Sequence, residues 1–285
     1  MRTVLFSILL IFSFSLADEL IIGKKGKVSF YTQESEFLVA KGDSVVGPID
    51  LLPMAQTDYL VIENENPDYR VLTYLIEPTF KDWKKNLLGK TVSYEGNGRI
   101  IKGVVRDISE KFITVETKRG VIVTTLPEFP SKISSHFNWK ELYSPKITLR
   151  INSKISDSVK IYFKYPLANI YWEPFYILKV KGKTGKFYSF YNIKNQTQIY
   201  FNNIDIKIQK SKSKIFILAK KTSLPSLSEK RVEMNKPKSV NFNDRAYVGK
   251  EFPDGKVIIY KNKMIIGYGK VINGYLKLRK WAYYT

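Results

Sequence analysis

The stretch that decides the fold is residues 146–165, KITLRINSKISDSVKIYFKY. In both of its halves, hydrophobic side chains alternate with polar or charged ones, a period of two residues that is typical of a β-strand with one buried face. The inward set is Ile147, Leu149, Ile151, Val159, Ile161, Phe163 and Tyr165. We therefore expect two antiparallel strands of a sandwich, with hydrophobic residues inside and lysines outside.

The same alternation recurs along most of the chain. It is clear at residues 176–181, 204–208 and 215–219, and it returns between residues 256 and 278, where Asn273-Gly274 is a strong hairpin signal. The predicted class is all-β, an Ig-like β-sandwich. Two segments depart from the pattern: residues 79–88 have the spacing of one short helix, and residues 220–245 predict a mobile loop.

A second, smaller β unit is expected at residues 88–130. Strand-like segments at 91–94, 99–106, 112–117 and 121–126 are separated by short Gly-containing turns. Gly103 marks a bend in the second of them. Four short strands in about 40 residues favour a small SH3-like or Sm-like barrel inserted into the sandwich.

The composition excludes several kinds of site. The chain has 285 residues, no cysteine and one histidine, His136. Disulfides, cysteine metal sites, thiol nucleophiles and multi-histidine metal centres are therefore excluded. We see neither a phosphate-binding Gly-rich loop nor a nucleophile elbow, and we expect no cofactor.

The N-terminus has the layout of a signal peptide. Arg2 precedes the hydrophobic run of residues 4–15, and Ser15-Leu16-Ala17 supplies small residues for cleavage after Ala17. No later segment reaches membrane-spanning length, so we expect an exported protein that is periplasmic, on the cell surface or secreted. The predicted domains are residues 1–17 as signal peptide, 18–87 as an N-terminal strand layer packing with the sandwich, 88–130 as the barrel and 145–285 as a basic C-terminal sandwich.

Charge is distributed unevenly along the chain. The formal net charge is +21, and residues 146–285 carry 29 Lys and Arg against eight Asp and Glu, whereas residues 18–145 carry 17 against 18. This asymmetry favours an anionic partner for the second half. Candidates are an acidic polysaccharide, a lipid surface, an acidic envelope protein or nucleic acid bound without sequence preference. Most of the basic residues are lysines, which favours diffuse, salt-sensitive attraction.

Lysines in the second half fall into two groups. Candidate polyanion-binding residues are Lys179, Lys181, Lys183 and Lys186, followed by Lys207, Lys210, Lys212, Lys214, Lys220 and Lys221. The aromatic residues Phe187, Tyr188, Phe190 and Tyr191 interleave with the first group, a combination that binds anionic polymers by charge and stacking. An outer sheet face kept soluble by lysine explains the same pattern, and both interpretations stay open.

Evidence for a catalytic site is weak. His136 lies in Ser-Ser-His-Phe-Asn-Trp, without an evident nucleophile or orienting partner. The carboxylate pairs Glu34/Glu36 and Glu63/Glu65 have the spacing of one strand face. Such pairs can hydrolyse glycosides or bind Ca²⁺, but no Asp/Asn-rich, Gly-containing loop accompanies either pair, which favours solvated strand faces. We therefore assign no catalytic, cofactor-binding or metal residue.

Three segments together carry a family resemblance. They are residues 67–130; YPLANIYWEPFYILKV at 165–180, with the segments 191–197 and 204–208; and FPDGKVIIY at 252–260. The chain resembles exported bacterial proteins that carry the domain of unknown function 4139, related to the C-terminal half of mucoidy-inhibitor-A-like proteins. The resemblance implies an N-terminal strand layer, an inserted barrel and a sandwich with a Trp-x-Pro-x-Tyr strand, and it supplies no catalytic residues. The coiled coil of the mucoidy-inhibitor-like members is missing here.

The residues that match the family motifs are Trp172, Pro174, Tyr176, Asn195 and Thr197. Trp172 and Tyr176 share a strand face, which favours a place in the core with Pro174 at an edge or bulge over an aromatic ligand platform.

The sequence as a whole predicts an exported, non-enzymatic envelope protein, a structural or interaction module with a basic C-terminal sandwich. The alternatives are a glycan-acting envelope hydrolase that uses an unidentified carboxylate pair, and an extracellular module that binds DNA without sequence preference.

Overall fold

The computed structural model describes residues 18–278, apart from residues 54, 81, 97, 129–131, 137, 183, 212–213 and 242–244. The predicted signal peptide, Lys183 and Lys212 lie outside the described residues. The described chain is almost entirely β-sheet, which confirms the predicted all-β class. It divides into two compact units. The first consists of Gln33–Tyr165, and the second consists of residues 18–32 and 166–278. The predicted domain boundaries stay predictions.

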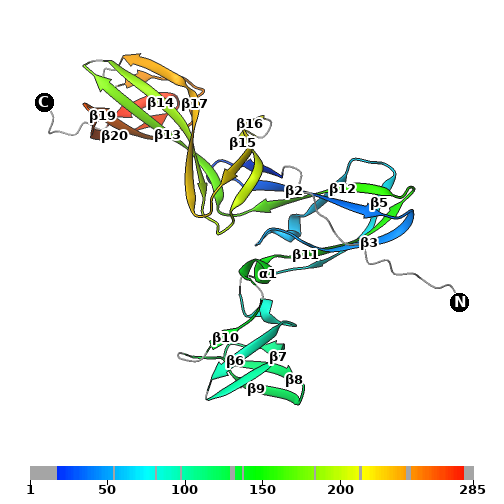
Figure 1. Ribbon diagram of the computed structural model, residues 1–285. Helices are drawn as coiled ribbons and strands as arrows, with labels where there is room; N and C mark the ends of the chain where they lie inside the picture. The colour runs from blue at the N-terminus through cyan, green and yellow to red at the C-terminus, as the bar shows by residue number, and fades with distance from the viewer. Residues whose placement is uncertain are drawn as a thin grey trace. The chain divides into compact units, whose positions relative to one another are not determined.

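The first unit contains two small sheets and the inserted barrel (Figure 1). One sheet has the order β3 (Gly42–Asp50), β11 (Lys146–Ser153), β5 (Tyr69–Glu77). The other joins the second half of β2 (Ser29–Val39) to β12 (Asp157–Leu167) and β4 (Val61–Asn64). A short 3-10 turn, η1 (Thr57–Tyr59), precedes β4.

The residues that decided the predicted fold form the core of this unit. Ile147, Leu149 and Ile151 of β11 are fully buried, and so are Ile161 and Phe163 of β12. The intervening lysines face outward, where Lys160 pairs with Glu34 and Lys164 pairs with Glu63. Alternation along β11 and β12 thus gives one dry face and one charged face on each strand, as the sequence predicts.

The inserted barrel forms a five-stranded sheet with its own core. Its order is β10 (Lys132–Ser134), β6 (Thr91–Gly96), β7 (Arg99–Ile108), β8 (Phe112–Thr117), β9 (Gly120–Thr125). The buried residues are Leu87, Val92, Tyr94, Val105, Ile113 and Val115. Gly103 is required at the bend of β7, because a Cβ there would lie 2.2 Å from the Glu116 carbonyl oxygen. The four predicted strands are confirmed to within about two residues, and β10 adds a fifth beyond residue 130.

The helix predicted at residues 79–88 is wrong. Only η2 (Lys85–Leu87), a single 3-10 turn, forms there. The buried Asn86 side chain accepts a hydrogen bond from the Phe80 N–H (2.6 Å) and donates one to the Phe80 carbonyl (2.7 Å), which closes a loop in place of a helix. The Thr79 hydroxyl, which would cap such a helix, instead donates a hydrogen bond to the Tyr143 carbonyl. The one α-helix described is α1 (Trp139–Tyr143), capped by Asn138.

The second unit consists of two groups of strands. In the first, β16 (Lys214–Leu224) pairs with β15 (Phe201–Ser211), which pairs in parallel with β1 (Glu19–Ile22), which pairs with the start of β2. The second is a seven-stranded sheet. Its order is β17 (Ser228–Asn241), β14 (Thr184–Asn195), β13 (Ile170–Lys181), β19 (Gly255–Lys261), β20 (Met264–Ile272), β21 (Tyr275–Leu278), β18 (Arg245–Tyr247).

The seven-stranded sheet curls around a hydrophobic core, since its first and last strands, β17 and β18, also contact each other (Figure 1). The side chains inside are Tyr176, Leu178, Phe187, Val240, Ala246, Val248, Phe252, Val257, Ile259, Val271 and Leu276. They come from every strand of the sheet, so one face of each strand is inside and the other is outside.

The mobile loop predicted at residues 220–245 is also wrong over its described part, since residues 242–244 lie outside the described residues. β16 continues to Leu224, a turn containing Pro225 follows, and the 14-residue β17 then pairs with β14 along its whole length. β17 is rich in charge because it lies at an edge of the sheet and buries little. Pro237 lies where the pairing register with β14 shifts, so no ladder hydrogen bond is lost there.

Candidate functional site

The β13–β14 hairpin separates two sets of aromatic side chains. Tyr176, Phe187 and Tyr191 point inward and are buried, with Tyr176 and Phe187 stacked at 5.1 Å between ring centroids. Tyr188 and Phe190, the other two aromatic residues near the first lysine group, lie on the outer face and are partly exposed. The aromatic run from 187 to 191 is therefore half core and half surface, as strand alternation requires.

The outer surface of the seven-stranded sheet combines lysines with hydrophobic rings, and we call it the aromatic–lysine face. Its members are Phe175, Ile177 and Lys179 on β13, Lys186, Tyr188 and Phe190 on β14, Lys256, Ile258 and Tyr260 on β19, Tyr268 and Lys270 on β20, and Lys277 on β21.

Lysines from two strands converge on one ring of this face. Lys179 and Lys186 are direct cross-strand partners, and their Nζ atoms lie 5.0 and 6.0 Å from the centroid of the Tyr188 ring. A cation over an aromatic face is attracted by the ring quadrupole. The arrangement holds two cations beside a partly exposed tyrosine, where an anionic group of a ligand has access to both.

A second aromatic cluster lies beside Tyr188, on the side away from Lys179 and Lys186. Phe175 and Phe190 are cross-strand partners with ring centroids 6.4 Å apart, and the Arg231 guanidinium carbon lies 4.0 Å from the Phe175 centroid. The stacked guanidinium covers Phe175 and keeps the ring pair in place.

Three lysines missed by the sequence analysis complete the face. Lys256, Lys270 and Lys277 are successive partners across β19, β20 and β21, and all three are exposed. Like Lys179 and Lys186, they form no ion pair within the described part of the chain. Each is a single lysine between uncharged neighbours, so the sequence shows only that it alternates with buried residues. The pairing register is what aligns the three.

Acidic residues at the β17 side are neutralised locally. Lys194 Nζ lies 2.8 Å from a Glu173 oxygen and 3.2 Å from a Glu229 oxygen. The hydrogen bond to Glu173 raises the pKa of Lys194, and a hydrogen bond from Asn192 lowers the pKa of Glu229. These carboxylates therefore oppose the positive field of the aromatic–lysine face only weakly.

The second predicted lysine group does not join this face. Its described members are on β15 and β16, in the other group of strands of the second unit. Lys207 forms an ion pair with Glu19, and Lys210 lies over the rings of Tyr191 (5.6 Å) and Phe216 (5.0 Å). Lys214, Lys220 and Lys221 are exposed on β16. Lys181 belongs to the first group and is exposed at the tip of the β13–β14 hairpin.

The Trp-x-Pro-x-Tyr residues lie in the interior. Trp172 and Tyr176 are fully buried, Trp172 Nε1 donates to the Gln209 carbonyl (3.2 Å), and the Tyr176 hydroxyl donates to the Pro253 carbonyl (2.6 Å). Pro174 lies where β13 changes partner, between the bridge at Trp172 and the β19 ladder that begins at Phe175. A residue without an N–H is tolerated at such a point.

Asn195 and Thr197 organise the connection from β14 to β15. The buried Asn195 amide donates to the carbonyls of Ile199 (2.9 Å) and Pro225 (2.8 Å), and its oxygen accepts from the Thr197 N–H and hydroxyl. Thr197 in turn accepts from the Ile199 N–H. This network satisfies buried backbone groups, and it leaves no amide atom of Asn195 available for a ligand.

One hydroxyl in the interior has no such partner. The Tyr191 side chain is almost fully buried, and its hydroxyl makes no hydrogen bond to any described residue. Its ring packs edge-on against Trp172, with centroids 5.2 Å apart. Burial raises the pKa of Tyr191 to about 12.

The polar groups of the first unit form structural contacts. Glu34 pairs with Lys160, Glu36 accepts a hydrogen bond from Ser158, and Glu63 pairs with Lys164. Glu65 is hydrogen-bonded to Tyr162, so all four carboxylates of the two Glu pairs contact residues of β12. His136 is exposed between β10 and α1.

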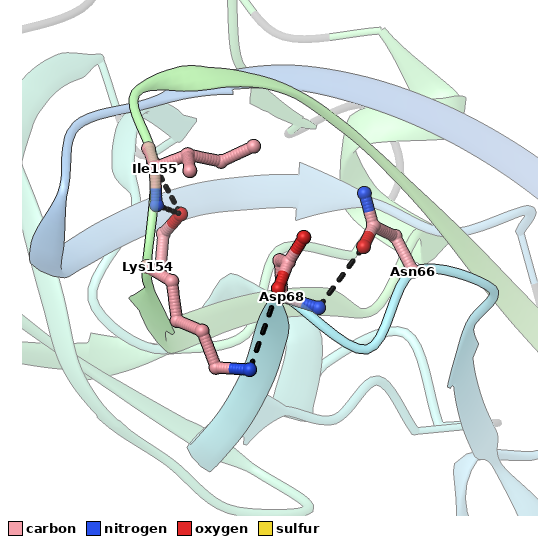
Figure 2. Close-up of polar contacts among 5 residues, drawn as sticks. Asn66, Asp68, Lys154 and Ile155 are labelled. Carbon is pink, nitrogen blue, oxygen red and sulfur yellow. Dashed lines mark hydrogen bonds and ion pairs between the residues drawn. The ribbon is translucent and has the colours of Figure 1, made fainter.

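A hydrogen bond and an ion pair join the turn between β11 and β12 to the loop before β5, as Figure 2 shows for the ion pair. Lys154 donates its N–H to the Asp68 carbonyl (3.0 Å), and its Nζ lies 3.3 Å from the Asp68 carboxylate. Asp68 donates its own N–H to the Asn66 side-chain oxygen (2.9 Å). These contacts are local and join two turns.

The described residues contain neither a cluster of metal ligands nor a helix that could span a membrane. No three His, Asp or Glu side chains in that part of the chain are grouped to hold a metal ion. No helix in the described ranges combines the length and the hydrophobicity that crossing a membrane requires.

No protein-family model, no curated protein and no solved structure matches the chain. The resemblance to proteins with the domain of unknown function 4139 stays a prediction.

Proposed function

We propose that this chain is an exported binding protein without enzymatic activity, and that its aromatic–lysine face binds an anionic polymer of the cell envelope. The observation that carries the proposal is the pair Lys179 and Lys186, whose two ammonium groups lie beside the partly exposed Tyr188 ring and form no ion pair with a described residue. Charge attracts an anionic chain, and the ring supplies short-range contact.

The surrounding charges support this proposal. Lys256, Lys270 and Lys277 extend the positive field across three further strands, and the carboxylates of Glu173 and Glu229 are already paired with Lys194. Glu233, the cross-strand partner of Phe190, lies at the β17 edge of the face. Lysines that served only to balance neighbouring acids would be paired with them. Here the cations are left available to a ligand, so balancing neighbouring acids is not their role.

The test is the affinity of the full chain for a polyanion in low salt. We expect heparin, used as the probe, to bind wild type, and Lys179→Gln with Lys186→Gln to weaken binding by about tenfold, a typical loss for two cations at a polyanion site. The matched control removes the same charge from the barrel, with Lys102→Gln and Lys118→Gln, both exposed and remote in sequence from the face. Equal weakening by both double variants would show that only net charge matters and would contradict the proposed site.

A further inference from the structure

The pairing register arranges the aromatic–lysine face into three parallel rows that run across the strands. The central row is hydrophobic: Tyr188, Ile177, Ile258 and Tyr268 are direct partners in that order across β14, β13, β19 and β20. All four are partly or largely exposed. With neighbouring strands about 4.8 Å apart, this row is about 14 Å long, which is the length of a few monomer units of a linear polymer.

The two rows beside it carry the charge. On one side the order is Phe190, Phe175, Lys256, Lys270, Lys277, and on the other it is Lys186, Lys179, Tyr260, Ile265. In the first of these rows the lysines lie on β19, β20 and β21, and in the second they lie on β14 and β13. Each side of the central row therefore carries cations over a different set of strands. Glu233 faces Phe190 on β17, which ends the positive surface there.

This pattern matches a polymer with hydrophobic faces and anionic edges. A pyranose ring presents a C–H face that packs against aromatic and aliphatic side chains alike, and a hexuronate unit adds one carboxylate at its edge. An extended hexuronate chain carries carboxylates at both of its edges, so a unit over β13 and β14 and a unit over β19 to β21 can each direct one to the side on which the lysines lie. One unit advances the chain by close to the spacing of neighbouring strands, about 4.8 Å.

Nucleic acid fits the same surface less well. Base stacking requires open, flat rings, whereas Ile177 and Ile258 are the middle members of the central row and Phe175 is covered by Arg231. Duplex DNA presents no hydrophobic face to a central row at all, because its bases are stacked inside. Apart from Arg231, which lies over the Phe175 ring, the flanking cations are lysines, which lack the guanidinium fork that phosphate recognition favours.

We infer that the aromatic–lysine face binds an acidic polysaccharide of hexuronate units, which lies along the central row across the strands with its carboxylates directed to the lysines on either side. This inference rests on the proposed function and deepens it by naming the ligand chemistry and its direction.

The experiment is calorimetric titration of the full chain with a hexuronate octasaccharide, with its carboxyl-reduced neutral counterpart and with oligo-dT as comparisons. We expect binding of the octasaccharide and none of the neutral counterpart. Tyr188→Ala with Tyr268→Ala, and separately Lys256→Gln with Lys270→Gln and Lys277→Gln, should each weaken binding by about tenfold or more.

Matched controls come from the first unit: Tyr59→Ala with Tyr74→Ala, both exposed, and Lys102→Gln with Lys111→Gln and Lys118→Gln. These should bind like wild type.

Three results would overturn the inference. Tighter binding of oligo-dT, weakened by the same variants, would leave the proposed function standing and refute the polysaccharide. Octasaccharide binding that the central-row and lysine-row variants leave unchanged would refute the placement. Failure of wild type to bind the octasaccharide, oligo-dT or heparin at low salt would refute both the inference and the proposed function.

Discussion

Phe175 of β13 and Phe190 of β14 are direct partners in the antiparallel ladder, with ring centroids 6.4 Å apart, and the Arg231 guanidinium lies over the Phe175 ring at 4.0 Å. They lie on the outer side of the same two strands whose inner side carries the stacked Tyr176 and Phe187. One hairpin thus supplies both the core and the proposed binding face, so the core fixes the position of the outer rings.

The phenylalanine pair gives the first prediction. Phe175→Ala with Phe190→Ala should weaken polyanion binding about tenfold, because the rings flank the central row and hold Arg231 in place. Titration of heparin by isothermal calorimetry measures this effect, and circular dichroism checks that the variant is folded. A folded variant with wild-type affinity would show that these rings are not part of the site.

The unpartnered Tyr191 hydroxyl gives the second prediction. Tyr191→Phe should raise the free energy of unfolding by about 1 kcal/mol, because a buried hydroxyl without a hydrogen bond is costly. Tyr176→Phe is the matched control, and it should lower stability by about 1 kcal/mol, because it removes the bond to the Pro253 carbonyl. Urea denaturation of both variants checks the opposite signs. Destabilisation by Tyr191→Phe would mean that this hydroxyl is satisfied.

The same residue predicts a dependence on alkaline pH. Burial raises the pKa of Tyr191 to about 12 in the folded chain, against about 10 for an unfolded tyrosine. Between these two pKa values, Tyr191 keeps its proton in the folded chain and loses it in the unfolded chain. The contribution of Tyr191 to the free energy of unfolding is therefore complete below pH 10 and is lost as pH rises from about 10 to 12. The urea midpoint of wild type should fall more steeply over this range than that of Tyr191→Phe. Parallel curves for the two proteins would contradict the prediction.

Asn195 gives a prediction about the connection between β14 and β15. Asn195→Ala removes two donated and two accepted hydrogen bonds at a buried position and should cost about 3 kcal/mol of stability. Gln196→Ala, at the exposed neighbouring position, should change stability by less than about 0.5 kcal/mol. Thermal unfolding of both variants measures the difference. Similar small effects for the two would show that the network is dispensable.

The parts of the fold that sequence alone predicts are those whose side chains alternate. Strands such as β11 and β12 bury one face completely, so the alternation of residues alone predicts that Ile147 and Phe163 face the core, whichever strands pair with theirs. β17 was not predicted as a strand, because an edge strand is held mainly by backbone hydrogen bonds and its sequence resembles that of a solvated loop. The expected helix at 79–88 failed because a side chain, Asn86, supplied the hydrogen bonds of a different turn.

The sequence predicts one part of the candidate site and not the other. Lys179 and Lys186 stand close together on one hairpin, so their shared face follows from alternation. The alignment of Lys256 with Phe175 depends on a parallel pairing between residues 81 positions apart, which no local pattern specifies. The second lysine group has an equally strong pattern, but the structure places it in other strands, with Lys207 paired to Glu19.

The most direct test of the central claim is the salt dependence of heparin affinity for the full chain and two charge-matched variants. One replaces Lys179, Lys186, Lys256, Lys270 and Lys277 by Gln, and the other replaces Lys41, Lys102, Lys111, Lys118 and Lys140, which are exposed in the first unit. If the aromatic–lysine face is the binding surface, wild type and the second variant will show the same steep loss of affinity with salt, and the first will show almost none. Identical salt slopes for the two variants would contradict the claim.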